Sequence, residues 1–506
     1  MTLNQSMNIA LNSMKNNQYA LSVVSHNIAN LNTEGYHRQR VNFSENAYLT
    51  NCENAIMTIR GMDGASIDSL TGFIDEGAFK DLIEKNSDAE YYNNLSGIFD
   101  NLEGITDELG ENGLSALLNE FYVSASNLEK YPTDMAIRQQ FLFSAENVCE
   151  KFNYISDKFD VFEENQYNNL QMDVTTVNNL LSELADANKA HITNNQSDAT
   201  KAQIDNIVSK LSNYMNIVTD TNKNGSINVY VGGVAVVQGS ELKNTLECGY
   251  DSSLENPLNI HLKANDGSGK TSKDISSSFT SGSLRAYTEV LNGTNKSITT
   301  INDIKASIDK AAGAFAQALN DIQTYSDGTV FAASITADES GEMILEQATN
   351  PLITSKDGSS TINAKNIQVN SDVMDDPFLV AAARIDTSKY EDDSWKKSIG
   401  NSDNAAAFSA LRNGKIIEYD DGIKTTLSDY LVTNAANIGM NAANISSKAD
   451  LYQDMADSAA ANYSNLIGVN LDEELADMIR YQRSFEASAR VFAAANDIMD
   501  TILNMV

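Results

Sequence analysis

The sequence predicts a mainly α-helical protein with a β-rich insertion (α+β): terminal coiled-coil helices, a long helical bundle core and an outer β-containing domain. Three observations predict this class. Apolar residues recur in alternating steps of four and three at both ends of the chain, which is the spacing of a helical seam. Residues 227–237 contain apolar residues with the period of two that is typical of strands. Only four prolines interrupt the 506 residues, so long helices are permitted over most of the chain.

The N-terminal segment carries the first seam, whose one polar member is Asn17. The seam ends at the turn-forming residues 32–35, where Gly35 suits a helix C-cap. Its members are Leu3, Met7, Ala10, Met14, Asn17, Leu21, Val24, Ile28 and Leu31.

The C-terminal segment repeats this alternation to its last residue, with two polar members, Gln482 and Asn496. Asp472, Glu473 and Glu474 stand in the first turn, where carboxylates complement the helix dipole. A polar residue on a seam costs stability but fixes register and partner number. The members of the second seam are Leu471, Leu475, Met478, Gln482, Phe485, Ala489, Phe492, Asn496, Met499, Leu503 and Val506.

The pattern between the seams changes several times and divides the chain into three expected domains. Apolar residues have a helical period from about 80 to 220, from 284 to 325 and again from 427, whereas 326–377 is rich in Gly, Ser and Asp with short β-prone pieces. We expect a terminal coiled-coil domain from 1–50 plus 460–506. The helical core domain should comprise 80–220, 281–325 and 427–459, and the β-rich outer domain 222–280 and 326–426.

Composition excludes several classes of function. The chain has 35 basic and 69 acidic residues, a formal net charge of −34, which argues against nucleic acid and anionic membranes as partners. No apolar run is long enough to cross a membrane, and the N-terminal residues lack the apolar core of a cleavable signal peptide. Cys52, Cys149 and Cys248 are far apart, so neither a disulfide framework nor a cysteine zinc site is expected.

Candidate sites for chemistry are weak. Asp220, Asn222, Asn224, Gly225 and Asn228 take the positions of a calcium loop, but Val231 stands where the bidentate glutamate is needed, so a plain turn is the better interpretation. His26 and His37 have no cysteine or serine elbow beside them. The acidic pairs at 375–376 and 392–393 are interpreted as solvated loop charges rather than catalytic carboxylates. We therefore predict no metal, no cofactor and no enzymatic activity.

The two seams are the strongest signal. Their plain interpretation is two amphipathic helices packed on the protein's own core. Their terminal positions, length and polar members favour assembly instead, because a solitary helix is marginal in water and needs neighbours on its flanks. We therefore expect the ends to be loose in the monomer and to order on polymerisation.

Residues around the N-terminal seam resemble a known signature. Residues 23–30 followed by 33–36 are similar to the N-terminal motif of the bacterial flagellar rod, hook and hook-associated axial family, and residues 35–39 have the G-Y-x-R-Q form of its hook-associated protein 1 branch, the hook–filament junction proteins. The C-terminal residues 468–474 and Tyr481-Gln482 are similar to the same family. The signature residues that this chain shares are Asn27, Asn30, Gly35, Tyr36, Arg38 and Gln39.

Internal segments extend this resemblance. Residues 114–121, Pro132, Arg138 and Phe152-Asn153 are similar to the family's first helical core, and 225–233 and 367–382 to its hairpin and to the stretch before its return helices. The chain departs from the family pattern at His37, at Phe485 and at 203–206, where a family arginine is missing.

The resemblance implies a structural subunit of the hook–filament junction that assembles through its terminal helices. Implied partners are copies of itself, the flagellar hook protein, the second junction protein and a cytoplasmic export chaperone. The implied location is the extracellular flagellum, reached from the cytoplasm by type III export without a cleaved signal. Two alternatives stay open: a hook or rod axial subunit, and a secreted hydrolase carried on a flagellar scaffold.

Overall fold

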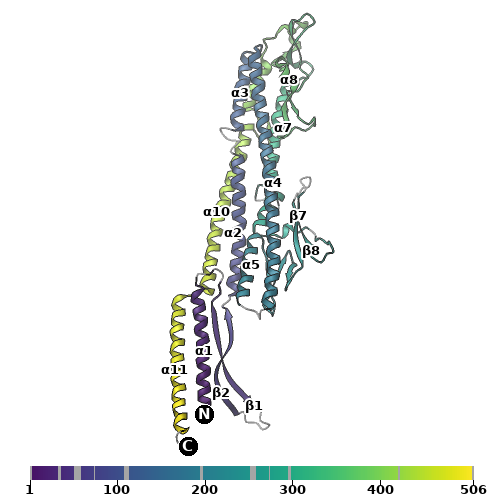
Figure 1. Cartoon of the computed structure of the whole chain (residues 1–506). Coiled ribbons are helices and arrows are strands. Elements are labelled where there is room, and N and C mark those ends of the chain that lie inside the picture. Colours follow the sequence, from purple (N-terminus) through teal and green to yellow (C-terminus); the bar gives the residue numbers. More distant parts are fainter. Residues whose placement is uncertain are drawn as a thin grey trace.

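The computed structural model shows an elongated rod with both termini at one end (Figure 1). It describes residues 3–31, 33, 36–50, 58–72, 75–106, 113–193, 198–250, 258–272, 274–293, 298–419 and 422–503. Cys52 and Gly35 lie outside these residues. No described helix combines the length and apolar character that a membrane span requires.

Long helices form the body of the rod, which confirms the predicted mainly α class with β insertions. α2 (Glu76–Thr106) and α3 (Leu114–Lys130) lead away from the termini, and α4 (Met135–Thr193) returns beside them (Figure 1). The 59 residues of α4 span about 90 Å at 1.5 Å per residue. The bundle is completed by α5 (Asp198–Tyr214), α6 (Ser283–Asn292), α7 (Ile301–Gln323) and α10 (Leu427–Ile467), the last packed along α2.

Local sequence explains where two of these helices begin. Thr300 and Asp303 form a capping box at the start of α7, and the Thr426 hydroxyl accepts a hydrogen bond from the Asp429 amide at the start of α10. The inward faces are apolar and meet in one continuous core. Buried aromatic rings lie at its centre, in edge or tilted contact with one another: Phe121, Phe141, Phe152, Phe315 and Phe408.

A first group of strands lies beside α4 and α5. β3 (Val218–Thr221), β4 (Ile227–Val231), β5 (Val234–Gln238) and β6 (Glu241–Leu242) form an antiparallel sheet in that order. β7 (Asn244–Tyr250) pairs with β8 (Leu258–Ala264). The β4–β5 hairpin confirms the strands predicted at 227–237, and β3 shows that the turn at 220–225 joins two strands rather than a helix and a strand.

A second group of strands lies at the far end of the rod. β9 (Val330–Ala337) is flanked by β10 (Met343–Gln347) and β13 (Ala383–Asp386), while β11 (Ile353–Ser355) pairs with β12 (Ile367–Val369) and β14 (Ile417–Glu418) with β15 (Lys424–Thr425). Two short helices, α8 (Ser371–Asp375) and α9 (Asp403–Ala410), complete this group. Hydrogen bonds hold this second group of strands against the bundle. Buried Arg138 on α4 donates to the backbone carbonyls of Pro377, Phe378 and Val380.

The two groups do not form the one outer domain that was predicted from 222–280 plus 326–426. Their described strands belong to different sheets, and Figure 1 shows them at different heights along the rod. The physical reason is local pairing: each strand finds an antiparallel partner close in sequence, so each stretch closes its own sheets and packs on its own section of the helices.

The terminal unit consists of two helices and a long hairpin. α1 (Leu3–Ala29) and α11 (Leu471–Leu503) lie side by side, and β1 (Gln39–Thr50) pairs with β2 (Thr58–Gly72) next to α1 (Figure 1). The hairpin was not predicted, and it carries the N-terminal part of this unit past the expected boundary at residue 50.

Candidate assembly site at the paired termini

The two terminal helices run in opposite directions, because both chain ends lie at the same tip of the molecule (Figure 1). On α11, four residues that are buried or contact the N-terminal segment recur every seven positions. Glu474 and Ala495 are buried, Tyr481 packs against the cluster of Ala20, Val23 and Val41, and the Ser488 hydroxyl is 2.8 Å from that of Ser13. This contact line is one residue displaced from part of the predicted C-terminal seam.

The N-terminal seam residues mostly point toward this interface. Asn17 and Val24 are buried, and the Asn17 amide donates to the Ser13 carbonyl oxygen at 2.8 Å, so this polar member is satisfied within its own helix. Leu31 is exposed. Ala10 is also buried, and the remaining members are partly buried: Leu3, Met7, Met14, Leu21 and Ile28.

The C-terminal seam residues divide into two sets. One set is partly buried in the isolated chain: Met478, Phe485, Ala489, Phe492 and Met499. The other set is exposed: Leu471, Leu475, Gln482 and Asn496. The Leu503 side chain and Val506 lie outside the described residues.

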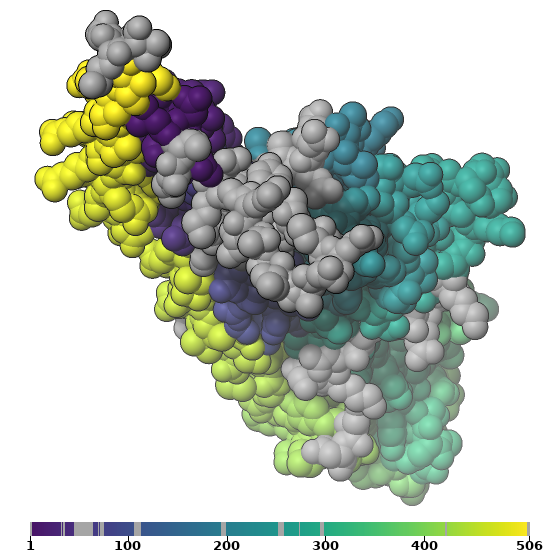
Figure 2. All heavy atoms as spheres, turned by 90° about the horizontal axis from the view of Figure 1, so that it is seen from below, coloured from purple at the N-terminus to yellow at the C-terminus, as the bar shows by residue number. Residues whose placement is uncertain are grey.

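Large apolar side chains are exposed on α11, on both flanks of the line that contacts the N-terminal segment. These side chains are between 42 % and 53 % accessible: Leu471, Leu475, Ile479, Val491, Ile498 and Ile502. Seen from below, α11 and α10 form a continuous band along one side of the molecule (Figure 2). Apolar side chains exposed along both flanks of a helix on an acidic protein mark an interaction surface.

Four of the predicted signature residues meet where α1 ends and α11 begins. The buried Asn27 side chain accepts hydrogen bonds from the Tyr36 hydroxyl at 2.8 Å and the Gln39 backbone amide at 3.1 Å. Its own amide donates to the Gln39 carbonyl oxygen at 2.9 Å and to Glu474 Oε2 at 3.0 Å. The same glutamate accepts from Arg38 Nε at 2.7 Å. Asn30 lies one turn on and donates to the His26 carbonyl oxygen.

Charge strengthens this junction. Arg38 also donates to Glu473 Oε2 at 2.6 Å, so one guanidinium holds two carboxylates of the first turn of α11. Burial alone would lower the pKa of Arg38, but the two carboxylates outweigh burial and raise it. The arrangement is a charged clasp that fixes the entry angle of α11 against α1, and we call these residues the clasp: Asn27, Tyr36, Arg38, Gln39, Glu473 and Glu474.

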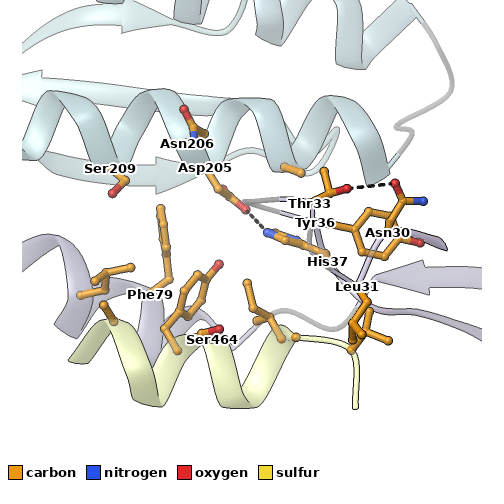
Figure 3. A pocket seen from close by; sticks show the side chains of 17 residues that line it. Asn30, Leu31, Thr33, Tyr36, His37, Phe79, Asp205, Asn206, Ser209 and Ser464 are labelled. Carbon is orange, nitrogen blue, oxygen red and sulfur yellow. Dashed lines mark hydrogen bonds and ion pairs between the residues drawn. The ribbon is translucent and has the colours of Figure 1, made fainter. Parts of the chain in front are cut away.

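A cavity of about 440 Å³ lies beside the clasp, where the terminal unit meets the bundle (Figure 3). His37 points into it from the N-terminal segment and lies 3.8 Å from Asp205 on α5. Asp205 also binds Lys201 at 2.5 Å, yet its Oδ2 atom has no hydrogen-bond partner among the described residues. Burial raises the pKa of Asp205, and the nearby Lys201 and His37 offset this only in part.

Two residues of this site, Asp205 and Glu474, could not be predicted as site residues from the sequence. Asp205 stands within 203–206, which was noted only as a departure from the family pattern, and Glu474 was interpreted as a residue that complements the helix dipole. A charged residue is rarely fully buried, so nothing in its local sequence indicates the 1 % exposure of Glu474.

The remaining candidates for chemistry do not converge. In the described part of the chain, no three His, Cys, Asp or Glu side chains are grouped so that they could hold a metal ion. In the suspected calcium loop, Asn222 and Asn228 bond to each other through their amides, and Asn224 accepts from Ser226. These oxygens are already engaged within the turn.

Comparison with known proteins places three segments of the chain. A family model described as the helical domain of flagellar hook-associated protein FlgK matches residues 99–328. Models of the flagellar basal body rod FlgEFG protein C-terminal segment and of the flagella basal body rod protein match 460–505 and 7–37. The terminal matches cover α1 and α11, and the central match covers α3 to α7.

Whole-length relatives agree with these segments. Flagellar hook-associated protein 1 of Bacillus subtilis is 25 % identical over 96 % of this chain and 95 % of its own. The proteins of the same name from Salmonella typhimurium and Escherichia coli are 22 % and 21 % identical, with 99 % of each chain covered. The solved structure of the flagellar hook junction protein FlgK from Burkholderia pseudomallei has a TM-score of 0.58 at 14 % identity, and covers 75 % of this chain and 98 % of its own, which supports the fold.

Paired terminal helices on a helical rod, with rod-protein matches at both ends, define a structural axial protein of the bacterial flagellum. Among these proteins, the chain belongs to the hook-associated protein 1 (FlgK) family, the structural subunits of the hook–filament junction.

Proposed function

We propose that this chain takes its place in the flagellum through α1 and α11, which pair within the subunit and pack through the exposed apolar flanks of α11 against neighbouring subunits. The exposed apolar side chains on the flanks of α11 carry this proposal. Six large apolar side chains about half exposed to water are unfavourable on a free subunit, and burying the exposed half of each would contribute about 1 kcal/mol. Neighbouring copies, placed around a common axis, would cover them.

The tips of both helices order on polymerisation in this proposal. The clasp holds only the end of the pair next to the bundle, through Asn27, Arg38 and Glu474. The apolar cluster of Ala20, Val23 and Val41 also lies near the clasp, and farther toward the chain ends the Ser13 and Ser488 hydroxyls make a polar contact between the two helices. Neighbours would therefore supply much of the packing at the tips.

Specific partners follow from the family resemblance. The subunit contacts the hook protein on one side and the second junction protein on the other, and a cytoplasmic chaperone covers the apolar α11 face before export. Export proceeds through the flagellar type III channel to the extracellular flagellum. The chain has no catalytic role in this proposal, since its relatives are structural flagellar proteins and the clasp carboxylates, exposed Glu473 and buried Glu474, are engaged in ion pairs with Arg38.

A truncation tests the assembly role. Deleting residues 471–506 should leave a soluble, folded subunit that fails to support a filament in a strain without its own copy. The control restores the full chain in the same strain. Normal filament attachment with the truncated subunit would contradict the proposal.

The null strain separates the alternatives. Loss of the filament with an intact hook, and with flagellin shed into the medium, supports the junction role. Loss of the hook itself would instead indicate a hook or rod subunit.

A further inference from the structure

Two exposed apolar stripes lie outside the terminal unit, one on α10 and one on α4. Their members are more than a third accessible, and several of them are more than half accessible. The α10 stripe contains Val432, Met440, Leu451, Met455 and Leu466. The α4 stripe contains Met135, Phe143, Tyr154, Val161 and Met172.

The two stripes share the same spacing. Val432, Met440 and Leu451 are separated by eight and eleven residues, and Met135, Phe143 and Tyr154 are separated by the same intervals. Eleven residues make three helical turns, so Met440 and Leu451 lie on one side of α10 and Phe143 and Tyr154 on one side of α4, while the interval of eight residues places Val432 and Met135 about 80° away, at the edge of each stripe. Laid side by side in parallel, the two helices would bring Val432 to Met135, Met440 to Phe143 and Leu451 to Tyr154.

The charges beside the stripes have a matching order. A lysine stands three residues before the central apolar residue in both helices, Lys448 before Leu451 and Lys151 before Tyr154. An exposed aspartate stands three residues after it, Asp454 on α10 and Asp157 on α4. Each stripe therefore has a basic flank on one side and an acidic flank on the other.

More charges extend these flanks. Lys151 and Lys158 lie 5.1 and 5.3 Å from the Tyr154 ring, on the basic flank of α4. Asp450 and Asp457 are exposed beside Asp454, on the acidic flank of α10.

Orientation decides whether these flanks attract. When two helices pack in parallel, the flank on one side of a seam faces the opposite flank of its neighbour, as the e and g positions do in a parallel coiled coil. Lys151 and Lys158 would then face Asp450 and Asp454. Antiparallel packing brings like flanks together and is unfavourable.

Subunits that share one direction along an axis offer this parallel arrangement. α4 and α10 both run from the far end of the rod toward the termini (Figure 1). Two copies with the same polarity can therefore set α4 of one beside α10 of the other.

The pairing of α10 with α4 would shift each subunit along the rod axis relative to its neighbour. Within one chain, Tyr452 stacks on Tyr92, the neighbouring Tyr91 bonds to Glu289 on α6, and Ser283 on α6 bonds to Asp173. Leu451 is therefore roughly level with Asp173, which is 19 residues, or about 30 Å, from Tyr154 along α4. A heterologous contact with such a displacement propagates as a helical array.

We propose that the α10 stripe of one subunit packs in parallel against the α4 stripe of the next copy of this chain, with Leu451 opposite Tyr154 and Asp450 and Asp454 opposite Lys151 and Lys158. This inference rests on the proposed assembly function and adds a lateral contact between bundles that does not involve α1 or α11.

Cysteine cross-linking in flagella tests the geometry. A strain without its own copy receives the chain with Tyr154→Cys and Leu451→Cys, in a background in which Cys52 and Cys248 are serine and buried Cys149 is kept. Mild oxidation of isolated flagella should give a ladder of disulfide-linked subunits, and each single variant should give none. Dimers from Leu451→Cys alone would indicate a twofold contact and overturn the proposal, as would the absence of a ladder in assembled flagella.

Charge exchange tests the pairing. Lys151→Glu with Lys158→Glu, or Asp450→Lys with Asp454→Lys, should each weaken lateral association and lower filament retention at least tenfold, and the four changes combined should restore it. Lys270→Glu on the first β group is the control for charge alone, and the thermal midpoint of each variant checks folding. Full retention with either double variant would overturn the lateral contact but leave the α11 role intact, because the 471–506 deletion tests that role separately.

Discussion

At the scale of single residues, the clasp is held by a small number of buried polar groups that satisfy one another. Asn27 alone makes four hydrogen bonds, two of them to the backbone of Gln39 and one to Glu474. A polar side chain buried in this way cannot be removed without leaving its partners unpaired in a dry site. The clasp should therefore be sensitive to substitutions that remove these hydrogen bonds.

Asn27→Ala tests this sensitivity. The change removes a donor to Glu474 and leaves the Gln39 amide without its acceptor, and each unpaired buried group costs about 1–3 kcal/mol. We expect amide exchange in the first two turns of α11 to quicken by at least tenfold in the isolated chain. Asn30→Ala is the matched control, because the Asn30 amide donates to the carbonyl of His26 in its own helix. Equal effects from the two variants would show that the clasp does not hold α11.

Because of Asp205, the stability of the contact between the terminal unit and the bundle should depend on pH. Burial raises its pKa above the ordinary 3.8, so the folded chain binds this proton more tightly than the unfolded chain does. The associated stabilisation is complete below about pH 4 and is lost as the pH rises through the folded pKa. The groups that act on this carboxylate are Lys201, His37 and His191.

Asp205→Asn should remove this dependence. The thermal midpoint of the variant minus that of the unchanged chain should be more positive at pH 7 than at pH 4, because the amide has no charge to bury. Calorimetry at several pH values between these limits measures the difference. A difference that stays constant with pH would mean that the ion pairs with Lys201 and His37 fully compensate for burial.

At the scale of elements, the order of the terminal helices should decrease from the clasp toward the chain ends. Residues close to the clasp have buried ion pairs, whereas Ile498 and Ile502 near the end of α11 are half exposed. In the isolated chain we expect amide protection to be strongest near Glu474 and Tyr481 and to fall beyond Ala495. In assembled flagella, protection should extend along the whole of α11. Uniform strong protection before assembly would contradict ordering on polymerisation.

The helices and the hairpin differ in how well sequence predicts them. Long stretches of helical period located α2 to α5 and α10, and the strands at 227–237 were found because Val, Ile and Tyr alternate there. The β1–β2 hairpin was missed because its strands are polar and its pairing shifts register at three places, so no run of period two is long enough to detect.

The seams show a second limit. Heptad spacing identified which positions of α11 are apolar, but it cannot say which neighbour covers them. The line that contacts the N-terminal segment runs through Glu474, Tyr481, Ser488 and Ala495, while Leu471 and Leu475 are left for another partner. A seam with two apolar sides belongs to an assembly of several helices, and one chain contains only some of them.

At the scale of the whole molecule, stability is divided between one large core and several small apolar clusters, one of them in the sheet of β9, β10 and β13. The main core is continuous through the bundle, the first β group and much of the second. The terminal unit has a separate small cluster of Ala20, Val23 and Val41, and it meets the bundle at the cavity of Figure 3. Cooperative unfolding requires shared packing, and here little packing is shared.

We therefore expect the isolated chain to unfold in two steps. The terminal unit should melt first, with a small enthalpy, and the bundle should follow in a large transition, because enthalpy grows with the number of residues that unfold together. Calorimetry of the full chain and of the chain that ends at residue 470 separates the two, since the shortened chain should lose the first transition and keep the second. A single transition in the full chain, shifted as a whole by the truncation, would mean that the termini are an integral part of the main core, and the exposed α11 face would then need another explanation than assembly.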